Sequence, residues 1–479
     1  MPLKLNRPRV IYVSRDNVWC RVENPTEPIV KFLRKTLSRS YNTRTRDGRF
    51  ITVKRYLYFK RGHRFPSGLL SMARKKGCRR SIIFKVNDTR LRPPVPKPLP
   101  KTMDHLKDFQ KDAIEVALSH GNGIWYHPTG AGKTEMAIGL ALRAAVPTLF
   151  LVNEKSLLLQ ASERWKGLTG TSARFVGQEP VVKSTGLYIG MFQTIYSRRH
   201  EPALARFLRK RIKCVITDEC HILGARTFWE VMMLCEGAFY RIGMSATPLS
   251  RSDGMNIYTV AATGGIIHQI KINELTDGED ARLVSPKIVF YDYPGQEDVP
   301  WPGRWDLLYK KGIVRAKARN RAIIRLCKVA TKPCLVFFEW KSHGYELRDE
   351  LEAEDYKVEI VHGNVDGVER RKLVKRLNSG DIEILVASKV FQQGVDIPNL
   401  KSCINAAGMK SEIKSLQKLG RGMRKTDTKI DVEYFDLIDK HNDSLLTQSW
   451  ARVETYEKAG LEVKVVKKLK EAKAWMIKS

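Results

Sequence analysis

The sequence predicts an α/β protein in which two doubly wound parallel sheets follow a small basic α+β domain. Short apolar runs alternate with segments of helical apolar spacing, which is the pattern of βαβ units. Phosphate-binding and acidic motifs directly follow two of these runs, where open α/β sheets bind ligands. The 479 residues also exceed the usual size of one domain. We expect a basic domain over 1–95, a proline-rich linker over 96–105, lobes over 106–278 and 279–442, and a basic helical extension over 443–479.

The first hundred residues are strongly basic but carry the pattern of a folded domain. They hold 26 Lys and Arg against 5 Asp and Glu, a net charge of +21 within a total of +34. Strands are predicted over 10–13, 50–59 and 81–86, and helices over 28–37 and 65–77. We assign Tyr58 and Phe59 to the core of this domain rather than to base stacking. Such a charge implies a polyanionic partner, and nucleic acid is favoured over a membrane surface.

Each lobe is predicted from its own series of short buried strands. The expected strands lie over 148–152, 186–190, 213–217 and 241–244 in the first lobe, and over 334–338, 357–361, 383–387 and 402–406 in the second. The segment from Asp443 onward is predicted as helix, with basic residues that face either DNA or solvent.

A phosphate loop, HPTGAGKT, occupies residues 127–134 between a predicted strand and a predicted helix. Its glycines allow backbone N–H groups to surround a phosphate at the helix N-terminus. The alternative, a glycine-rich turn before an ordinary helix, is disfavoured by this context. We therefore expect ATP and Mg²⁺, with Lys133 at the β- and γ-phosphates and the Thr134 hydroxyl on the metal. The nucleotide-binding residues of the loop would be Thr129, Gly130, Ala131, Gly132, Lys133 and Thr134.

Two carboxylates in DECH follow the apolar run 214–217. At the carboxyl end of a buried strand, Asp218 can hold the same Mg²⁺ as Thr134, and Glu219 can polarise the attacking water. Without the phosphate loop, a solvated strand end would be the better interpretation. Later in the chain, QKLGRGMR places Arg421 and Arg424 three residues apart on a predicted helix. Their guanidinium groups suit the charge that develops on a γ-phosphate, the alternative being a solvated basic helix.

The order of these motifs, with SATP at 245–248 and GVDIP at 394–398, resembles superfamily 2 DNA helicases of the bacteriophage UvsW type, which are related to XPB-like and RecG-like motors. The resemblance implies two RecA-like motor lobes. It also implies that Gln110 contacts adenine, that Gly394 and Asp396 contact the nucleotide from the second lobe, and that Ser245 and Thr247 couple the ATP site to the nucleic-acid track. Gln193 and Thr194 are expected to contact the sugar–phosphate backbone.

The resulting functional hypothesis is an ATP-dependent DNA helicase or translocase that remodels junctions, forks, D-loops and R-loops, including RNA–DNA hybrids. An RNA helicase of the DEAD/DEAH sort is the alternative, and the motor motifs alone barely separate the two. A non-enzymatic nucleic-acid binder is disfavoured because Lys133, Asp218, Glu219, Arg421 and Arg424 are all present. Translocation polarity, preferred DNA structure and oligomeric state stay open.

The eight cysteines show no C-x-x-C pair and no zinc-ligand spacing. Cys214, Cys334 and Cys403 lie in apolar runs, where we expect buried, reduced thiols. No apolar run reaches the roughly 18–20 residues that span a bilayer. These observations, with the lack of a signal-peptide pattern, favour a reducing cytoplasmic location, which would be the host cytoplasm for a phage protein.

Overall fold

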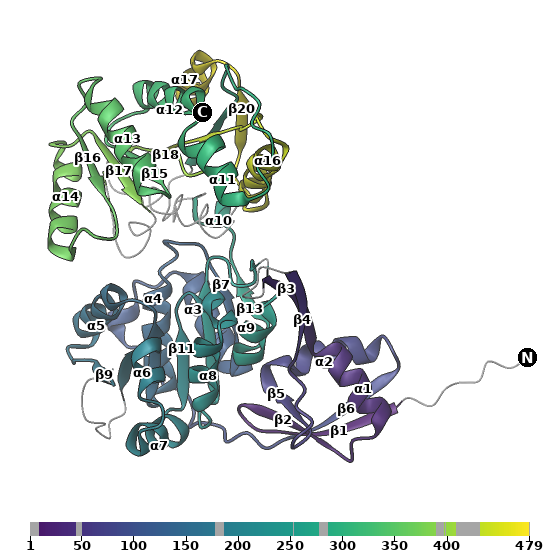
Figure 1. The fold of residues 1–479 in the computed structure, drawn as a ribbon. Coiled ribbons are helices and arrows are strands. Elements are labelled where there is room, and N and C mark those ends of the chain that lie inside the picture. Colours follow the sequence, from purple (N-terminus) through teal and green to yellow (C-terminus); the bar gives the residue numbers. More distant parts are fainter. Residues whose placement is uncertain are drawn as a thin grey trace, which may run out of the picture. The chain divides into compact units, whose positions relative to one another are not determined.

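A computed structural model describes residues 9–44, 50–177, 186–251, 253–276, 286–388, 397, 399–408 and 432–478. Its internal contacts divide the chain into two units (Figure 1). The first unit comprises residues 1–127 and 132–269, and the second comprises 270–479 together with 128–131. The first contains the N-terminal domain and the first lobe, and the second contains the second lobe. The predicted fold class is confirmed, because each lobe has a seven-stranded parallel sheet and the N-terminal domain has a small sheet of its own.

The N-terminal domain is built on a four-stranded mixed sheet in the order β5–β2–β1–β6. β1 pairs antiparallel with β2 and parallel with β6. Val30 and Leu33 of helix α1, with Leu37 directly after it, lie in the core at the i, i+3, i+7 spacing of one helix face. The elements are β1 (Arg9–Arg15), β2 (Trp19–Glu23), α1 (Glu27–Thr36), β5 (Arg64–Pro66), a 3₁₀ turn η1 (Ser67–Leu69), α2 (Leu70–Cys78) and β6 (Ile82–Asp88).

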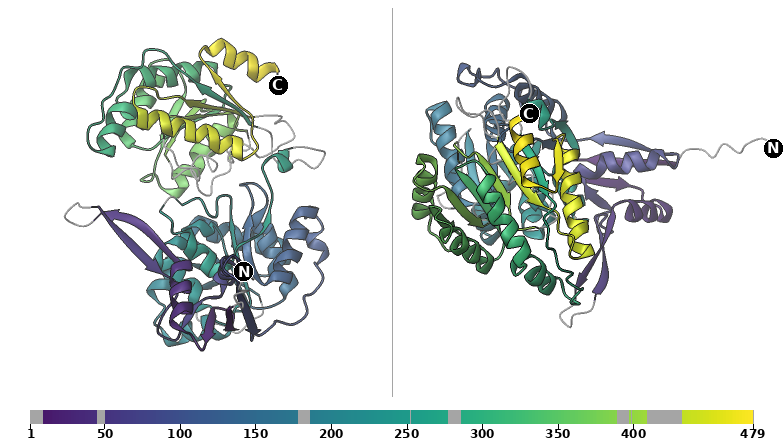
Figure 2. Two further views of the ribbon diagram at one scale, coloured as in Figure 1. Left: turned by 90° about the vertical axis from the view of Figure 1, so that its right-hand side faces the viewer. Right: turned by 90° about the horizontal axis from the view of Figure 1, so that it is seen from above.

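Strands β3 (Ser38–Arg44) and β4 (Phe50–Tyr56) form a separate antiparallel ribbon that projects from this domain (Figure 2). Tyr58 is 2% exposed and belongs to the core, as predicted. Phe59 is only half-buried and packs edge-on against Trp19, with ring centroids 5.6 Å apart.

The N-terminal domain packs directly against the first lobe. Ile257 and Ala261 of α9 (Asn256–Thr263) belong to the same hydrophobic core as the N-terminal strands. Gly68 lies so close to α9 that a Cβ there would stand 2.2 Å from the Val260 carbonyl oxygen. The prolines of the linker therefore do not act alone in positioning this domain, because a shared apolar interface holds it as well.

The first lobe has the strand order β13–β7–β12–β11–β8–β10–β9, with all neighbouring strands parallel. Alternate residues of each strand face opposite sides of the sheet. In β8, Phe150 and Val152 contact the helices of one face, and Leu149 and Leu151 contact those of the other. Helices α3, α4 and α5 cover the first face, and α6, α7 and α8 cover the second (Figure 1).

The strands of the first lobe are β7 (Asn122–Tyr126), β8 (Thr148–Val152), β9 (Arg174–Val176), β10 (Leu187–Met191), β11 (Cys214–Thr217), β12 (Tyr240–Ser245) and β13 (Ile266–Gln269). The helices are α3 (Asp108–His120), α4 (Lys133–Ala144), α5 (Lys155–Thr169), α6 (Phe192–Ser197), α7 (Pro202–Lys210), the 3₁₀ helix η3 (Cys220–Gly224) and α8 (Arg226–Leu234).

The second lobe has the strand order β16–β17–β15–β18–β19–β14–β20, again with parallel neighbours. Its strands are β14 (Pro286–Tyr291), β15 (Cys334–Phe338), β16 (Val358–Val361), β17 (Ile384–Ser388), β18 (Ser402–Asn405), β19 (Val432–Leu437) and β20 (Val463–Val466). Its helices are α10 (Asn273–Thr276), α11 (Trp305–Tyr309), a π-helical turn η4 (Lys310–Val314), α12 (Lys317–Val329), α13 (Lys341–Glu352), α14 (Gly367–Ser379), α16 (Asp443–Lys458) and α17 (Leu469–Lys478).

The C-terminal segment differs from the predicted helical extension. Between α16 and α17, strand β20 pairs in parallel with β14 and forms the edge of the second-lobe sheet. Ala472 and Met476 of α17 are buried in the core of that lobe. Pairing with β14 therefore overrides the helical spacing of this lysine-rich stretch.

A buried ionic network stabilises the second lobe. Arg319 donates to Asp439 at 2.8 Å, and Arg452 donates to Asp436 at 2.9 Å, with all four side chains fully buried. The same two guanidinium groups donate to the backbone carbonyls of residues 406 and 408. The network thus fixes the chain that follows β18.

None of the helices in the described part of the chain has the length and apolarity that a bilayer crossing requires.

Candidate active site

The phosphate loop joins the carboxyl end of β7 to the N-terminus of α4. Gly130 and Gly132 have φ angles of 89° and 79°, a left-handed conformation that favours glycine. This conformation turns the chain so that the helix begins at Lys133. The Lys133 ammonium donates to the carbonyl oxygen of His127 at 3.2 Å and so folds back over the loop. The predicted strand and helix around the loop are both present.

His127 stands at the first position of the loop, where the general pattern has glycine, and its ring is fully buried. It stacks on Trp125 and packs against Phe109, with ring centroids 6.4 Å and 6.2 Å away. Its Nε2 lies 2.7 Å from Nδ1 of His268, whose Nε2 lies 3.1 Å from the Asp112 carboxylate. Burial, His268 and Lys133 lower the pKa of His127 to about 2, so that the ring is neutral at physiological pH. The histidine therefore anchors the base of the loop by packing.

Asp218 and Glu219 directly follow β11 at the carboxyl edge of the sheet. The Asp218 carboxylate accepts a hydrogen bond from the Glu219 backbone N–H at 2.9 Å. Glu219 has a φ angle of 48°, an uncommon conformation for a residue with a side chain, which costs about 1–3 kcal/mol. Strain of this kind persists where the surrounding contacts hold the residue in place, and here those contacts are made by its carboxylate.

The Glu219 carboxylate connects DECH to SATP. Its Oε2 accepts from the Ser245 hydroxyl at 3.2 Å and lies 3.2 Å from Nδ1 of His221. The Ser245 oxygen in turn accepts from the Thr247 backbone N–H at 3.1 Å. The Ser245 carbonyl accepts from the His127 backbone N–H, also at 3.1 Å. The acidic motif, the SATP motif and the phosphate loop are thus joined by hydrogen bonds.

The two adjacent carboxylates differ in their electrostatic surroundings. Burial and the neighbouring Glu219 charge raise the pKa of Asp218. Burial opposes ionisation of Glu219 as well, but the hydrogen bond from His221 and the charge of Lys133 hold the pKa of Glu219 below its usual range. Glu219 is consequently an anion in this structure, as a group that polarises water must be.

The residues at this edge suit a magnesium ion. Mg²⁺ prefers carboxylate and hydroxyl oxygens together with substrate phosphates. Asp218 supplies a carboxylate whose ionisation is opposed by Glu219, and a nearby cation would relieve that repulsion. Thr134 supplies a half-buried hydroxyl in the first turn of α4. Among the residues that the structure describes, no cluster of three or more His, Cys, Asp or Glu side chains has the arrangement of a metal site.

Gln110 is fully buried near the start of α3. Its Oε1 accepts from the Lys107 backbone N–H at 3.0 Å, which makes it part of the helix cap. In this conformation the side-chain oxygen stabilises the N-terminus of α3. Contact of Gln110 with adenine remains a prediction.

Gln193 and Thr194 lie in the first turn of α6, at the carboxyl end of β10. The Gln193 amide donates to Asn153 Oδ1 at 2.8 Å. Asn153 directly follows β8, so two neighbouring strand ends present polar side chains together. Asn153 was not predicted as a site residue, although its position after a buried strand is the same signal that identifies Asp218.

Four predicted residues, Arg421, Arg424, Gly394 and Asp396, lie outside the described residues. Their roles stay predictions. All three cysteines expected to be buried, Cys214, Cys334 and Cys403, are buried and take part in no disulfide.

Comparison with known proteins assigns both lobes. Residues 103–250 match the family described as type III restriction enzyme, res subunit, and residues 318–426 match the helicase conserved C-terminal domain. The chain is 26% identical over 372 residues to the DNA 3'-5' translocase XPB2 of Sulfurisphaera tokodaii, covering 70% of this chain and 82% of that protein. It is 27% identical over 356 residues to the ATP-dependent DNA helicase uvsW of Enterobacteria phage T4, covering 69% and 68%.

Among solved structures, a fragment of a putative HsdR subunit of a type I restriction enzyme from Vibrio vulnificus shares the fold. The TM-score is 0.55 at 20% identity, over 75% of this chain and 67% of that one. The two helicase families cover the two lobes in the expected order, and the phosphate loop and DECH motif lie together at one sheet edge. The chain belongs to the superfamily 2 helicases, related to the uvsW and XPB types, and is an ATP-dependent helicase.

Proposed function

We propose that this helicase is a DNA motor that hydrolyses ATP to remodel branched DNA, such as junctions, forks, D-loops and R-loops. One observation carries the catalytic part of the proposal: the anionic Glu219 is hydrogen-bonded to Ser245, whose backbone in turn contacts the phosphate loop. The partner and the residue roles below are inferred from this arrangement and from the charge of the chain.

In the proposed reaction, the backbone N–H groups of the phosphate loop bind the triphosphate of ATP. Lys133 leaves the His127 carbonyl and contacts the β- and γ-phosphates. Asp218 and Thr134 would hold Mg²⁺, which neutralises charge on these phosphates when bound. Glu219 orients the attacking water and accepts its proton. Arg421 and Arg424 would stabilise the charge on the transferring phosphoryl group from the second lobe.

The hydrogen bonds around Ser245 suggest how hydrolysis is coupled to movement. When Glu219 accepts a proton, its carboxylate becomes a weaker acceptor for the Ser245 hydroxyl. The Ser245 oxygen also accepts from the Thr247 backbone, so that the SATP segment responds to the state of Glu219. Thr247 is 1% exposed, and its hydroxyl has no hydrogen-bond partner among the described residues. A buried hydroxyl of this kind is ready to form a bond in another conformation.

DNA is the proposed partner because the chain is strongly basic and because two of its relatives are described as DNA enzymes. The net charge is +34, of which +21 lies in the first hundred residues. A field of this sign attracts the phosphate backbone. Two relatives of this chain are described as a DNA translocase and a DNA helicase. We assign the single-strand contacts to Gln193 and Thr194 at the carboxyl edge of the first lobe, and contacts with duplex arms to the N-terminal domain.

The test is the rate of ATP hydrolysis measured in parallel with single-stranded DNA, duplex DNA, a four-way junction and RNA of matched length. We expect DNA to stimulate hydrolysis, with the junction effective at the lowest concentration. Stimulation by RNA alone would instead support the RNA-helicase alternative. Equal rates with and without any nucleic acid would contradict coupling between the ATP site and the track.

A further inference from the structure

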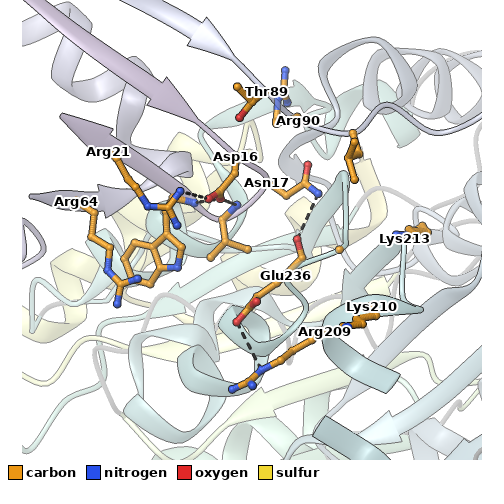
Figure 3. Close-up of a pocket in the computed structure, with 14 residues that line it drawn as sticks. Asp16, Asn17, Arg21, Arg64, Thr89, Arg90, Arg209, Lys210, Lys213 and Glu236 are labelled. Carbon is orange, nitrogen blue, oxygen red and sulfur yellow. Dashed lines mark hydrogen bonds and ion pairs between the residues drawn. The ribbon is translucent and has the colours of Figure 1, made fainter. Parts of the chain in front are cut away.

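A cavity of about 510 Å³ lies where the N-terminal domain meets the first lobe. Figure 3 shows that its side chains come from both parts of the unit. Six basic and two acidic residues line it, so its charge is strongly positive. The basic residues are Arg21, Arg64 and Arg90 from the N-terminal domain and its linker, and Arg209, Lys210 and Lys213 from the first lobe.

Both acidic residues of the cavity are occupied by local contacts. Asp16 accepts from the backbone N–H groups of Val18 and Trp19, at 2.9 Å and 2.6 Å, and pairs with Arg21. Glu236 pairs with Arg209 at 3.5 Å, and its backbone carbonyl accepts from the Asn17 amide. Asp16 therefore stabilises the β1–β2 turn, and Glu236 helps to hold the two parts of the unit together. Neither compensates the remaining cations.

Three cations of the cavity have no carboxylate partner among the described residues: Arg64, Lys210 and Lys213. The Arg64 guanidinium lies over the Trp19 ring, 4.2 Å from its centroid, which holds the group in one plane and leaves its N–H donors available. Lys210 ends α7, and Lys213 directly precedes β11. Unpaired cations that converge from separate elements are the usual lining of an anion site.

The cavity lies at the opposite edge of the first-lobe sheet from the ATP site. Lys213 precedes β11, whereas Asp218 follows it. Five residue steps at about 3.3 Å each separate them by roughly 16 Å. Glu236 likewise precedes β12, whereas Ser245 ends it. The cavity is therefore distinct from the ATP site and from the polar residues assigned to the single strand, which all lie at the carboxyl edge.

We propose that this cavity binds backbone phosphates of a duplex DNA arm and that the N-terminal domain and the first lobe bind them jointly. This inference rests on the proposed function, because it presumes a DNA substrate. An extended polyanion is favoured over a small anion because the positive charge continues outside the cavity. Lys60 and Arg61 are exposed on the tight turn that precedes Arg64. A duplex arm bound in this cavity would be held at a fixed position relative to the single strand of DNA bound at the carboxyl edge of the sheet.

The decisive experiment is fluorescence anisotropy of a labelled duplex and a labelled single strand, titrated at several salt concentrations with the full-length protein. The variant Lys210→Ala/Lys213→Ala is compared with Lys166→Ala/Arg174→Ala, which removes the same charge from α5 and β9 of the same lobe. Each phosphate contact contributes about 0.9 to the slope of log K against log salt. We therefore expect the slope for duplex to fall by about 1.8 and its affinity at 0.1 M salt to fall about 60-fold. The control variant should bind duplex as the wild type does.

Arg64→Ala tests the N-terminal side of the cavity in the same titrations. It should weaken duplex binding, and Arg64→Lys should restore most of the salt slope because the charge returns. Binding of the single strand, and ATP hydrolysis stimulated by it, should persist in every variant. Duplex affinity and slope equal to wild type in Lys210→Ala/Lys213→Ala would overturn the proposal while leaving the DNA motor intact. Polyglutamate, titrated in the same way, serves as a probe for an acidic protein. If Lys210→Ala/Lys213→Ala no longer binds polyglutamate but binds duplex as the wild type does, the cavity binds an acidic protein partner, and the proposal is overturned.

A different result would contradict the proposed function itself. If the wild type shows no ATP hydrolysis stimulated by any DNA, the motor assignment is wrong, whatever the cavity binds. Point substitutions are used here because deletion of residues 1–95 would expose Ile257 and Ala261 of the first lobe. A truncated chain would confound lost phosphate contacts with lost packing.

Discussion

Replacement of Glu219 by Gln is the sharpest perturbation of the ATP site. The amide has nearly the shape of the carboxylate, and its oxygen can still accept from Ser245, which lies at 3.2 Å. What disappears is the negative charge and the ability to accept a proton. General-base catalysis contributes about 10²–10⁴-fold. At about 1.36 kcal/mol per factor of ten, the barrier should rise by about 2.7–5.4 kcal/mol.

The effect on stability should be smaller than the effect on rate. Glu219 loses two charge-assisted contacts, from Ser245 and His221, each worth about 1.5–3 kcal/mol against about 0.5–1.5 kcal/mol for a neutral bond. Repulsion with Asp218 is removed at the same time, which offsets part of that loss. Nucleotide affinity should persist because Lys133 and Asp218 are intact. The variant therefore binds ATP but hydrolyses it slowly.

The assay is steady-state ATP hydrolysis at saturating single-stranded DNA, together with the dissociation constant of a fluorescent ATP analogue. Glu230→Gln serves as the matched control, since Glu230 pairs with Arg226 on the exposed surface of α8. We expect kcat to fall at least 100-fold in Glu219→Gln and to stay near wild type in the control. A Glu219→Gln protein with kcat within tenfold of wild type would show that another group activates the water.

Three further changes test other parts of the account. Lys133→Ala should abolish ATP hydrolysis yet leave duplex affinity by anisotropy unchanged; a parallel loss of DNA binding would place Lys133 in the DNA interface. Arg421→Ala or Arg424→Ala should lower kcat by about 10³-fold with little change in nucleotide affinity, and normal turnover would assign that arginine to a solvated face. Asp436→Ala should destabilise the second lobe by about 3–5 kcal/mol in denaturant unfolding, because the fully buried Arg452 loses its directly hydrogen-bonded carboxylate and keeps only Asp439, 4.0 Å away. A loss below 1 kcal/mol would mean that Asp439 and the backbone carbonyls are enough to satisfy Arg452.

Most strands with a continuous apolar run were predictable from the sequence, although the buried strands β14 and β19 were not predicted. The run 214–217 coincides with β11, and the strand before the phosphate loop coincides with the end of β7. Both are central strands buried on two faces, so that their own composition reveals them. Lys133, Asp218 and Glu219 were placed together because parallel strands bring their carboxyl ends to one edge.

Strands whose stability comes from a neighbour were missed. β3, with the sequence SRSYNTR, has no apolar period and is defined by its antiparallel pairing with β4. β2 is short and alternates apolar with charged residues. The sequence around β20 predicts a helix because its apolar residues and lysines fit both periods, and the pairing of β20 with β14 decides the outcome.

The contacts around the site that join distant parts of the chain were also beyond the sequence. His268 contacts His127 across 141 residues, and Asp112 contacts His268 across 156. No local pattern marks either pair. The docking of the N-terminal domain on α9 is likewise a tertiary feature, since the linker composition indicated only a spacer.

The central claim is that ATP hydrolysis drives this protein to remodel branched DNA. The most direct measurement is the conversion of a labelled four-way junction into separated duplex products, followed on native gels with ATP, with a non-hydrolysable analogue, and with Lys133→Ala. If this claim holds, the wild type converts the junction with ATP, and no conversion occurs with the analogue or with Lys133→Ala. Junction conversion at the same rate without hydrolysis, or an intact junction despite DNA-stimulated ATP hydrolysis, would contradict it.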